Sequence, residues 1–209
     1  MFKNEKFWNR IASHYASEPI KDQLLFEKTI ADIQRYLKTD DKLLDFGCGT
    51  GTYSIAIADK VNRVAAIDFS SSMIDIARER GKEAGKSNID FEYMSLFDER
   101  LNASSYDVVL AFNVFHLQED LDMVLQRIFQ LLSPQGRLIC KSVCMGRPFK
   151  LVAPLINFFS QFNILPRINA FTHIELEALM KKHNLKVIES KDHAVDEKTR
   201  FIVAEKASA

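Results

Sequence analysis

The chain has 209 residues, of which 47% are hydrophobic and 27% charged, and this suits one globular domain over residues 1–209 with a full-sized core. Lys plus Arg and Asp plus Glu each number 28, so no excess of positive charge indicates a nucleic-acid partner. No window reaches the roughly 18 uninterrupted apolar residues of a membrane span, and the first residues lack the apolar core of a signal peptide, so we expect a cytoplasmic protein. Cys48, Cys140 and Cys144 include no C-x-x-C pair, so neither a disulfide framework nor a metal site is expected.

Apolar side chains at helical spacing predict two helices before residue 40. We expect residues 1–38 to cap a cleft that the rest of the chain forms. The stripes are Phe7, Trp8, Ile11 and Tyr15 in the first helix and, after Pro19, Phe26, Ile30, Ile33 and Leu37 in the second.

A glycine-rich loop follows a short apolar strand. Leu43, Leu44 and Phe46 indicate a strand covered on both faces, and residues 52–58 can start a helix. Glycine adopts backbone angles that a Cβ forbids and allows a ligand to approach the main chain. The sequence therefore predicts a nucleotide-cofactor loop at Asp45, Gly47, Cys48, Gly49 and Gly51.

The glycine spacing separates several interpretations of this loop. A dinucleotide fingerprint is G-x-G-x-x-G/A, but here the third glycine comes one residue early and Thr52 stands where Gly or Ala is required. No Lys-Ser/Thr pair follows, which excludes a P-loop. A tight strand-to-helix turn without any ligand also explains three glycines.

The acidic-hydrophobic-Gly-x-Gly-x-Gly form resembles the cofactor loop of class I S-adenosylmethionine-dependent methyltransferases. The resemblance implies that S-adenosylmethionine binds at this loop and leaves as S-adenosylhomocysteine. It covers residues 40–145 in four segments and extends more loosely to the end of the chain.

A second strand over residues 61–68 ends in Asp68, about 20 residues beyond the loop, as the general nucleotide-binding pattern requires. Its two carboxylate oxygens can each accept a ribose hydroxyl. Ser70–Ser72 supplies a cap for the next helix, and Phe69 and Met73 are expected to sandwich adenine.

Residues 88–95 alternate as a third strand. The family often places an acid at the end of this strand to accept from the adenine amine, whereas here Ser95 aligns. Either Ser95 makes a weaker neutral hydrogen bond or Asp98 reaches in, and the main-chain N–H near Leu96 serves the ring.

Residues 106–113 form a fourth buried strand, followed by a helix with an apolar stripe from Leu117 to Leu132. The resemblance places Asn113 beside the methyl-donor sulfur, His116 near the acceptor pocket and Tyr15 near the methionine end of the cofactor. A structural role for His116 and core packing for Tyr15 are the alternatives. His116 or Tyr15 could remove a proton from an acidic acceptor, and His14 and His173 are weaker candidates.

The remaining segments complete an α/β fold. A turn at Pro134-Gln135-Gly136 leads to a fifth strand, and the alternation of strands and helices requires a doubly wound, Rossmann-like parallel sheet. Over residues 172–209, Thr172 and Glu175 form a capping box with Phe171 and Leu176 as the staple, before strands 185–188 and 201–204. The resemblance implies seven strands with the last one antiparallel.

Residues 146–171 form an apolar insertion whose side chains point around most of a helix from Phe149 onward. Three uses compete for it: plain core, a substrate lid, or a dimer or membrane-surface contact. A lid would make the acceptor apolar or aromatic.

The combined prediction is a methyltransferase that acts on a small molecule and resembles the quinone-biosynthesis branch. Two rival functions share part of the pattern. A nicotinamide-dependent oxidoreductase would share the glycines and Asp68, but Thr52 argues against it. A non-catalytic cofactor-binding module remains open, because a fold and its binding loop can outlive the chemistry.

Overall fold

The computed structural model describes residues 4–193 and 199–207, so the first three residues of the predicted cap lie outside it. Seven strands of the described residues form one sheet in the order β3-β2-β1-β4-β5-β7-β6. Their bounds are β1 Lys42–Phe46, β2 Arg63–Asp68, β3 Ile89–Tyr93, β4 Tyr106–Phe112, β5 Leu132–Val143, β6 Leu185–Asp192 and β7 Thr199–Lys206.

The pairing of these strands confirms the predicted doubly wound sheet. The pairs β1–β2, β1–β4, β2–β3 and β4–β5 are parallel, whereas β7 runs antiparallel to both β5 and β6. The strand order changes direction at β1, so the carboxyl ends of β1 and β4 diverge toward helices on opposite faces. Such a switch point is where open α/β sheets form their binding crevice.

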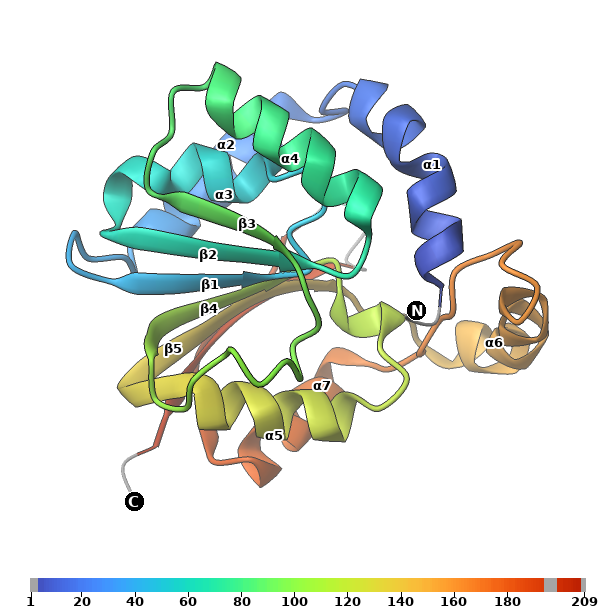
Figure 1. The fold of residues 1–209 in the computed structure, drawn as a ribbon. Helices are drawn as coiled ribbons and strands as arrows, with labels where there is room; N and C mark the ends of the chain where they lie inside the picture. Colours follow the sequence, from blue (N-terminus) through green and yellow to red (C-terminus); the bar gives the residue numbers. More distant parts are fainter. Residues whose placement is uncertain (1–3, 194–198, 208–209) are drawn as a thin grey trace.

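Helices cover both faces of the sheet (Figure 1). α2, α3 and α4 lie on one face and α5 and α7 on the other, while α1 and α6 stand beyond the carboxyl ends of the strands. Their bounds are α1 Glu5–Ser17, α2 Gln23–Gln34, α3 Thr52–Ile57, α4 Ser71–Glu83, α5 Leu121–Leu131, α6 Arg147–Ser160 and α7 His173–Lys182, with short 3-10 helices at η1 Ala58–Lys60 and η2 Phe115–Leu117.

Two apolar cores lie on the two faces of the sheet. Leu43 belongs to the core beneath α2, α3 and α4, and its neighbour Leu44 to the core beneath α5 and α7. Both side chains are completely buried. Successive residues of a strand point to opposite faces, so this burial confirms a strand covered on both sides.

Three expectations about element boundaries and packing need correction. The helix predicted from Leu117 starts only at Leu121, where the Asp120 side chain accepts from the Met123 N–H; residues 115–117 form η2 instead. The Pro134–Gly136 turn lies within β5 as an irregularity in its pairing with β4. α2 buries Ile33 in the core and belongs to the helical layer, so of the two N-terminal helices α1 is the one that stands over the strand ends.

The capping box of α7 is confirmed. The Thr172 hydroxyl accepts from the Glu175 N–H at 3.2 Å, and the Glu175 carboxylate accepts from the Thr172 N–H at 2.8 Å. Phe171 and Leu176 are both buried, as a hydrophobic staple requires. In the described part of the chain, no helix has both the length and the apolar character needed to cross a membrane.

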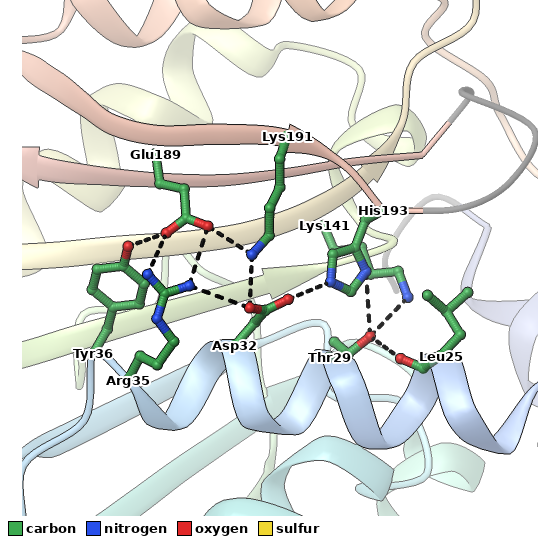
Figure 2. Close-up of polar contacts among 9 residues, drawn as sticks. All are labelled: Leu25, Thr29, Asp32, Arg35, Tyr36, Lys141, Glu189, Lys191 and His193. Carbon is green, nitrogen blue, oxygen red and sulfur yellow. Dashed lines mark hydrogen bonds and ion pairs between the residues drawn. The ribbon is translucent and has the colours of Figure 1, made fainter.

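A polar network fastens α2 to the β6–β7 edge of the sheet (Figure 2). Asp32 accepts from Lys191 at 2.7 Å and is bonded to His193 Nε2 at 2.9 Å, and Lys191 also pairs with Glu189. Burial raises the pKa of Asp32, but the hydrogen bonds from Lys191 and His193 outweigh it and leave that pKa below its ordinary value. The ionised Asp32 therefore stabilises the fold, and this contribution is lost as the pH falls through its lowered pKa.

Substituting Asp32→Asn should leave Lys191 and His193 without their shared anion. We expect the free energy of unfolding at pH 7 to fall by about 3 kcal/mol, the scale measured when one partner of a buried ion pair is removed. Urea titration measures it. The matched control is Asp90→Asn, which breaks the exposed Arg63–Asp90 pair at a similar distance of 2.6 Å and should cost far less stability, because water screens an exposed pair. Equal losses of stability in the two variants would contradict the stabilising role of the ionised Asp32.

Candidate functional site

The three loop glycines all have left-handed backbones, with φ of 73° at Gly47, 54° at Gly49 and 78° at Gly51. A Cβ on Gly47 would lie 2.6 Å from Val114 Cγ2, and one on Gly51 would lie 2.8 Å from the Phe91 ring. A Cβ on Gly49 would meet nothing within 4 Å. Gly47 and Gly51 are therefore fixed by packing, whereas the main chain at Gly49 faces open space.

Asp68, at the end of β2, shapes this loop. Its Oδ2 accepts from the Gly49 N–H at 3.0 Å, and its Oδ1 accepts from the Ser70 N–H at 2.8 Å. Burial raises the pKa of Asp68 to about 6, although hydrogen bonds from the Ser70, Gly49 and Phe69 N–H groups act in the opposite direction. A carboxylate has about four acceptor sites, so Asp68 keeps the capacity to accept from a ligand hydroxyl.

Asp45 lies deeper, on β1, and is 2% exposed. The Ser54 hydroxyl donates to its Oδ2 at 2.5 Å. Burial, together with the negative charge of Asp68, raises the pKa of Asp45 to about 6. Burial likewise raises the pKa of the Cys48 thiol, so that this thiol stays protonated at neutral pH.

α1 is held against the loop by two side chains that sequence reasoning did not single out. Asn9 Oδ1 accepts from the Ser70 hydroxyl at 2.6 Å, which ties α1 to the start of α4. Arg80, on α4, donates to Thr50 Oγ1 at 2.9 Å and to the Ala16 carbonyl at 2.6 Å. In the sequence, Asn9 stands between Trp8 and Ile11 of the first predicted helix, and its spacing gives no sign of this contact.

Tyr15 projects from α1 near the Asp68 carboxylate. Burial raises its pKa, and the negative charge of Asp68 raises it further. Its side chain is nevertheless half exposed. Because the raised pKa keeps the phenol protonated at neutral pH, Tyr15 is better suited to donate a hydrogen bond than to act as a base.

A cavity of about 170 Å³ lies at the carboxyl ends of the strands. The structure brings three predicted cofactor residues, Phe69, Ser95 and Leu96, to its wall. Met73 does not line this cavity and is 2% exposed, so the structure does not pair it with Phe69 around the same space. The wall also includes Trp8, Phe46, Leu117, Pro166 and Arg167.

Ser95 and Asp98 differ in how much hydrogen-bonding capacity they keep. Ser95 Oγ accepts from the Phe97 N–H at 3.1 Å and lines the cavity. Asp98 is gripped by the Arg100 guanidinium at 2.9 and 3.0 Å, and these side-chain bonds with the Arg100 N–H lower its pKa to about 2. This geometry favours Ser95 over Asp98 as the polar group for the cavity.

Asn113 and His116 follow the end of β4. Asn113 adopts a left-handed backbone with φ 54° and has an exposed side chain; such strain outside glycine is concentrated at functional sites. Burial lowers the pKa of His116 to about 4, so the ring is neutral at pH 7. Within the described residues its buried Nδ1 has no hydrogen-bond partner.

Comparison with known proteins decides the family. A model of the methyltransferase domain matches residues 37–199. The chain belongs to this family. The demethylmenaquinone methyltransferase of Lactococcus lactis is 34% identical over 101 residues, which are 47% of this chain and 40% of that relative. This chain therefore spans less than half the length of that curated relative.

Two solved structures share the fold. A methyltransferase from Aquifex aeolicus superposes with a TM-score of 0.71 at 15% identity and covers 99% of this chain and 100% of its own. The geranyl diphosphate C-methyltransferase of Streptomyces coelicolor superposes with a TM-score of 0.69 at 17% identity, over 86% of this chain and 74% of its own. The methyltransferase family match, together with Thr52, argues against the nicotinamide-dependent alternative.

Substituting Gly49→Ala should separate binding from folding. The added methyl enters open space, so we expect stability to fall by only about 1 kcal/mol from the left-handed backbone. The affinity for S-adenosylhomocysteine, measured by calorimetry, should fall about tenfold or more. Gly47→Ala is the control, because its methyl overlaps Val114 and should cost a further 1 to 3 kcal/mol or so of stability. Normal binding by Gly49→Ala would indicate a plain structural turn.

The raised pKa of Asp45 predicts a distinctive pH dependence. A carboxyl whose pKa rises on folding binds its proton more tightly in the folded state, so its effect on stability is most favourable near pH 4 and worsens as the pH rises to about 6. We expect Asp45→Asn to remove on the order of 2 kcal/mol of this decline between pH 4 and 7. Urea titrations across this window measure it.

The stability of wild type must be compared with that of Asp45→Asn at each pH, because the lowered pKa of His116 makes the stability of both proteins rise with pH.

S-adenosylmethionine, which is cationic, should bind wild type more tightly as the pH rises from 5 to 7, because Asp45 ionises over this range. Identical pH profiles for wild type and Asp45→Asn would refute the buried-carboxyl argument.

Proposed function

We propose that this protein transfers the methyl group of S-adenosylmethionine to a small apolar or aromatic acceptor. The observation that carries the proposal is the open space at Gly49, bordered by the Asp68 carboxylate that its N–H binds. Family membership supplies the reaction class, and the loop supplies a place for the cofactor.

The chemistry of the loop fits this cofactor. S-adenosylmethionine carries a sulfonium and an ammonium group, and cations favour the charged forms of neighbouring carboxyl groups. Asp45 and Asp68 are carboxyl groups of raised pKa, and neither makes an ion pair within the described residues. Asp68 keeps acceptor capacity for a ribose diol. The proposal assigns the ribose to Asp68 and the cationic methionine end to the neighbourhood of Asp45.

The remaining predicted residues have corresponding roles. Phe69, Ser95 and Leu96 would hold the adenine in the cavity that they line. Asn113 and Tyr15 would border the methionine end of the cofactor. Gly47 and Cys48 would act through the main chain, and Gly51 and Met73 through the packing that supports the loop.

S-adenosylmethionine supplies an already activated methyl group, so the protein's own task is to align an acceptor and to exclude water. His116 is the better of the two candidate bases. It is neutral at pH 7, and its Nδ1 lacks a partner within the described residues. Because its conjugate acid is strong, it suits only an acidic acceptor, such as a phenol or an activated carbon.

Residues 161–169 support a lid over the cleft. The Arg10 guanidinium donates to the Asn163 carbonyl at 2.7 Å, Arg167 pairs with Glu119 at 3.4 Å, and the Asn169 N–H donates to the His116 carbonyl at 2.7 Å. Pro166 and Arg167 line the cavity. These contacts join the segment to α1 on one side of the cleft and to the η2 region on the other.

The apolar character of this segment favours an apolar acceptor. Beyond Ala153 and Ser160, the α6 side chains that the structure describes lie at least partly exposed, which argues against plain core packing. The relatives named above act on demethylmenaquinone and geranyl diphosphate, two molecules that carry isoprenoid chains. We therefore propose a quinol, phenol or isoprenoid-type acceptor.

The test is S-adenosylhomocysteine release from S-adenosylmethionine with a panel of quinols, phenols, isoprenoid diphosphates, thiols and amines. We expect turnover within the first three classes, and calorimetry should show binding of S-adenosylhomocysteine but not of NAD. Asp68→Ala should weaken cofactor binding at least about tenfold, since each hydrogen bond to a charged acceptor is worth about 1.5 to 3 kcal/mol.

Asp90→Ala removes an exposed carboxylate from β3 and serves as the control for Asp68→Ala. Tight NAD binding would overturn the choice of cofactor. Cofactor binding without turnover on any acceptor would favour the non-catalytic module.

A further inference from the structure

We propose that the outer face of α6 and of the turn that follows it docks on an anionic lipid surface. We call this surface the apolar face. Its described members are Phe149, Leu151, Val152, Leu155, Phe158, Phe159, Phe162, Ile164 and Leu165, each exposed by 39% or more.

The exposed side chains form a stripe rather than a scatter. Leu151, Leu155, Phe158 and Phe162 recur at intervals of four, three and four residues, which places them along one side of a helix. Leu151 is 83% exposed. The Phe158 ring contacts those of Phe159 and Phe162, with centroids 5.6 Å apart in each case. Scattered exposed apolar residues need no explanation, but a gathered patch of this kind marks an interaction site.

The opposite side of α6 is already engaged. Asn157 donates to the Ile168 carbonyl at 3.0 Å and accepts from the Ile168 N–H at 2.8 Å, so the helix and the returning chain form a closed hairpin. Ala153 and Ser160 are buried on this inner side. The hairpin projects beyond the carboxyl edge of the sheet (Figure 1). A rotation of α6 about its own axis, with the returning chain held in place, would break the bonds between Asn157 and Ile168.

Charge selects the partner. The chain as a whole has no net charge, yet residues 123–174 contain no Asp or Glu. The sequence of the hairpin includes Arg147, Lys150 and Arg167. Arg10, exposed on α1, donates to the Asn163 carbonyl beside the apolar face. Among the described side chains, Arg10 is exposed, whereas Arg167 is paired with Glu119 at 3.4 Å. An apolar face in a segment whose sequence has three basic residues and no acidic one is complementary to an anionic membrane surface, whereas two copies of such a segment would repel each other.

The segment cannot serve as a span. α6 has 14 residues and contains Pro154, well short of the roughly 20 residues that cross a bilayer. Its geometry fits a helix that lies in the interface. The same hairpin continues into residues 163–169, which contact α1 and the η2 region over the cleft. If the proposed function holds, an apolar acceptor dissolved in the lipid would reach the cleft without crossing water.

The experiment is flotation of the full chain with vesicles made of phosphatidylcholine alone or of an equimolar mixture with phosphatidylglycerol. We expect binding to the mixed vesicles, a loss of binding at high salt and weak binding to phosphatidylcholine. The double variant Leu151→Asp/Leu155→Asp should lower the vesicle partition coefficient at least about tenfold, because two inserted side chains become charges that the surface repels.

Leu24→Asp is the matched control. Leu24 is 80% exposed on α2, outside the apolar face, compared with 83% for Leu151. It should bind vesicles as wild type does. Circular dichroism and S-adenosylhomocysteine affinity, unchanged in all variants, show that the fold and the cofactor site are intact.

Absence of wild-type flotation, or equal loss in the Leu24 control, would overturn the proposal. A mass that rises with concentration and returns to the monomer value in the double variant, without vesicle binding, would assign the face to a second copy. Absence of S-adenosylhomocysteine binding by wild type would instead refute the proposed function. Flotation would still test whether the apolar face binds anionic lipid.

Discussion

The site depends on one carboxylate that binds two main-chain N–H groups. Asp68 accepts from Gly49 and from Ser70, and thereby joins the loop after β1 to the turn after β2. Ser70 in turn holds Asn9 of α1, and Arg80 joins the loop to the end of that helix. Asp68 therefore orders the loop and the turn, and Asn9 and Arg80 hold α1 against these two segments.

The two buried carboxyl groups at the loop lower the stability of the folded protein when they ionise without a cationic partner. Asp45 and Asp68 are carboxyl groups with pKa values raised to about 6 by burial, and the negative charge of Asp68 raises the pKa of Asp45 further. Elsewhere the same chain shows how a buried carboxylate is stabilised: Asp32 has both Lys191 and His193 as partners, and its pKa is lowered (Figure 2). The contrast supports the proposal that the pair at the loop serves binding rather than stability.

Sequence reasoning succeeded where a local pattern fixes the structure. Leu43 and Leu44 are buried on opposite faces as an apolar run predicts, and Thr172 and Glu175 form the capping box that their spacing implies. Strand ends meet at one edge of a parallel sheet, so Phe69, Ser95 and Leu96 could be predicted to lie near one another.

What the sequence could not show depends on partners far along the chain. Asn9 meets Ser70, Arg80 meets Thr50 and Asp32 meets His193, and no local pattern specifies any of these pairs. An apolar run in a sequence also does not show what its side chains pack against. For α6, the sequence alone therefore does not separate core packing from an exposed face. The prediction for Met73 fails for the same reason, since helical spacing does not show whether a side chain faces the sheet or a ligand.

Within the part of the chain that the structure describes, three polar contacts join residues 161–169 to α1 and to the η2 region. The Arg167–Glu119 pair has side chains 35% and 49% exposed, so it contributes at most about 1 kcal/mol. The other two are single hydrogen bonds to main-chain carbonyls, each with a net worth of about 1 kcal/mol. The hairpin itself is closed more firmly, because Asn157 bonds both main-chain groups of Ile168. An acceptor could therefore enter by displacement of the hairpin as one unit. A surface that engages its apolar face would act on that same unit.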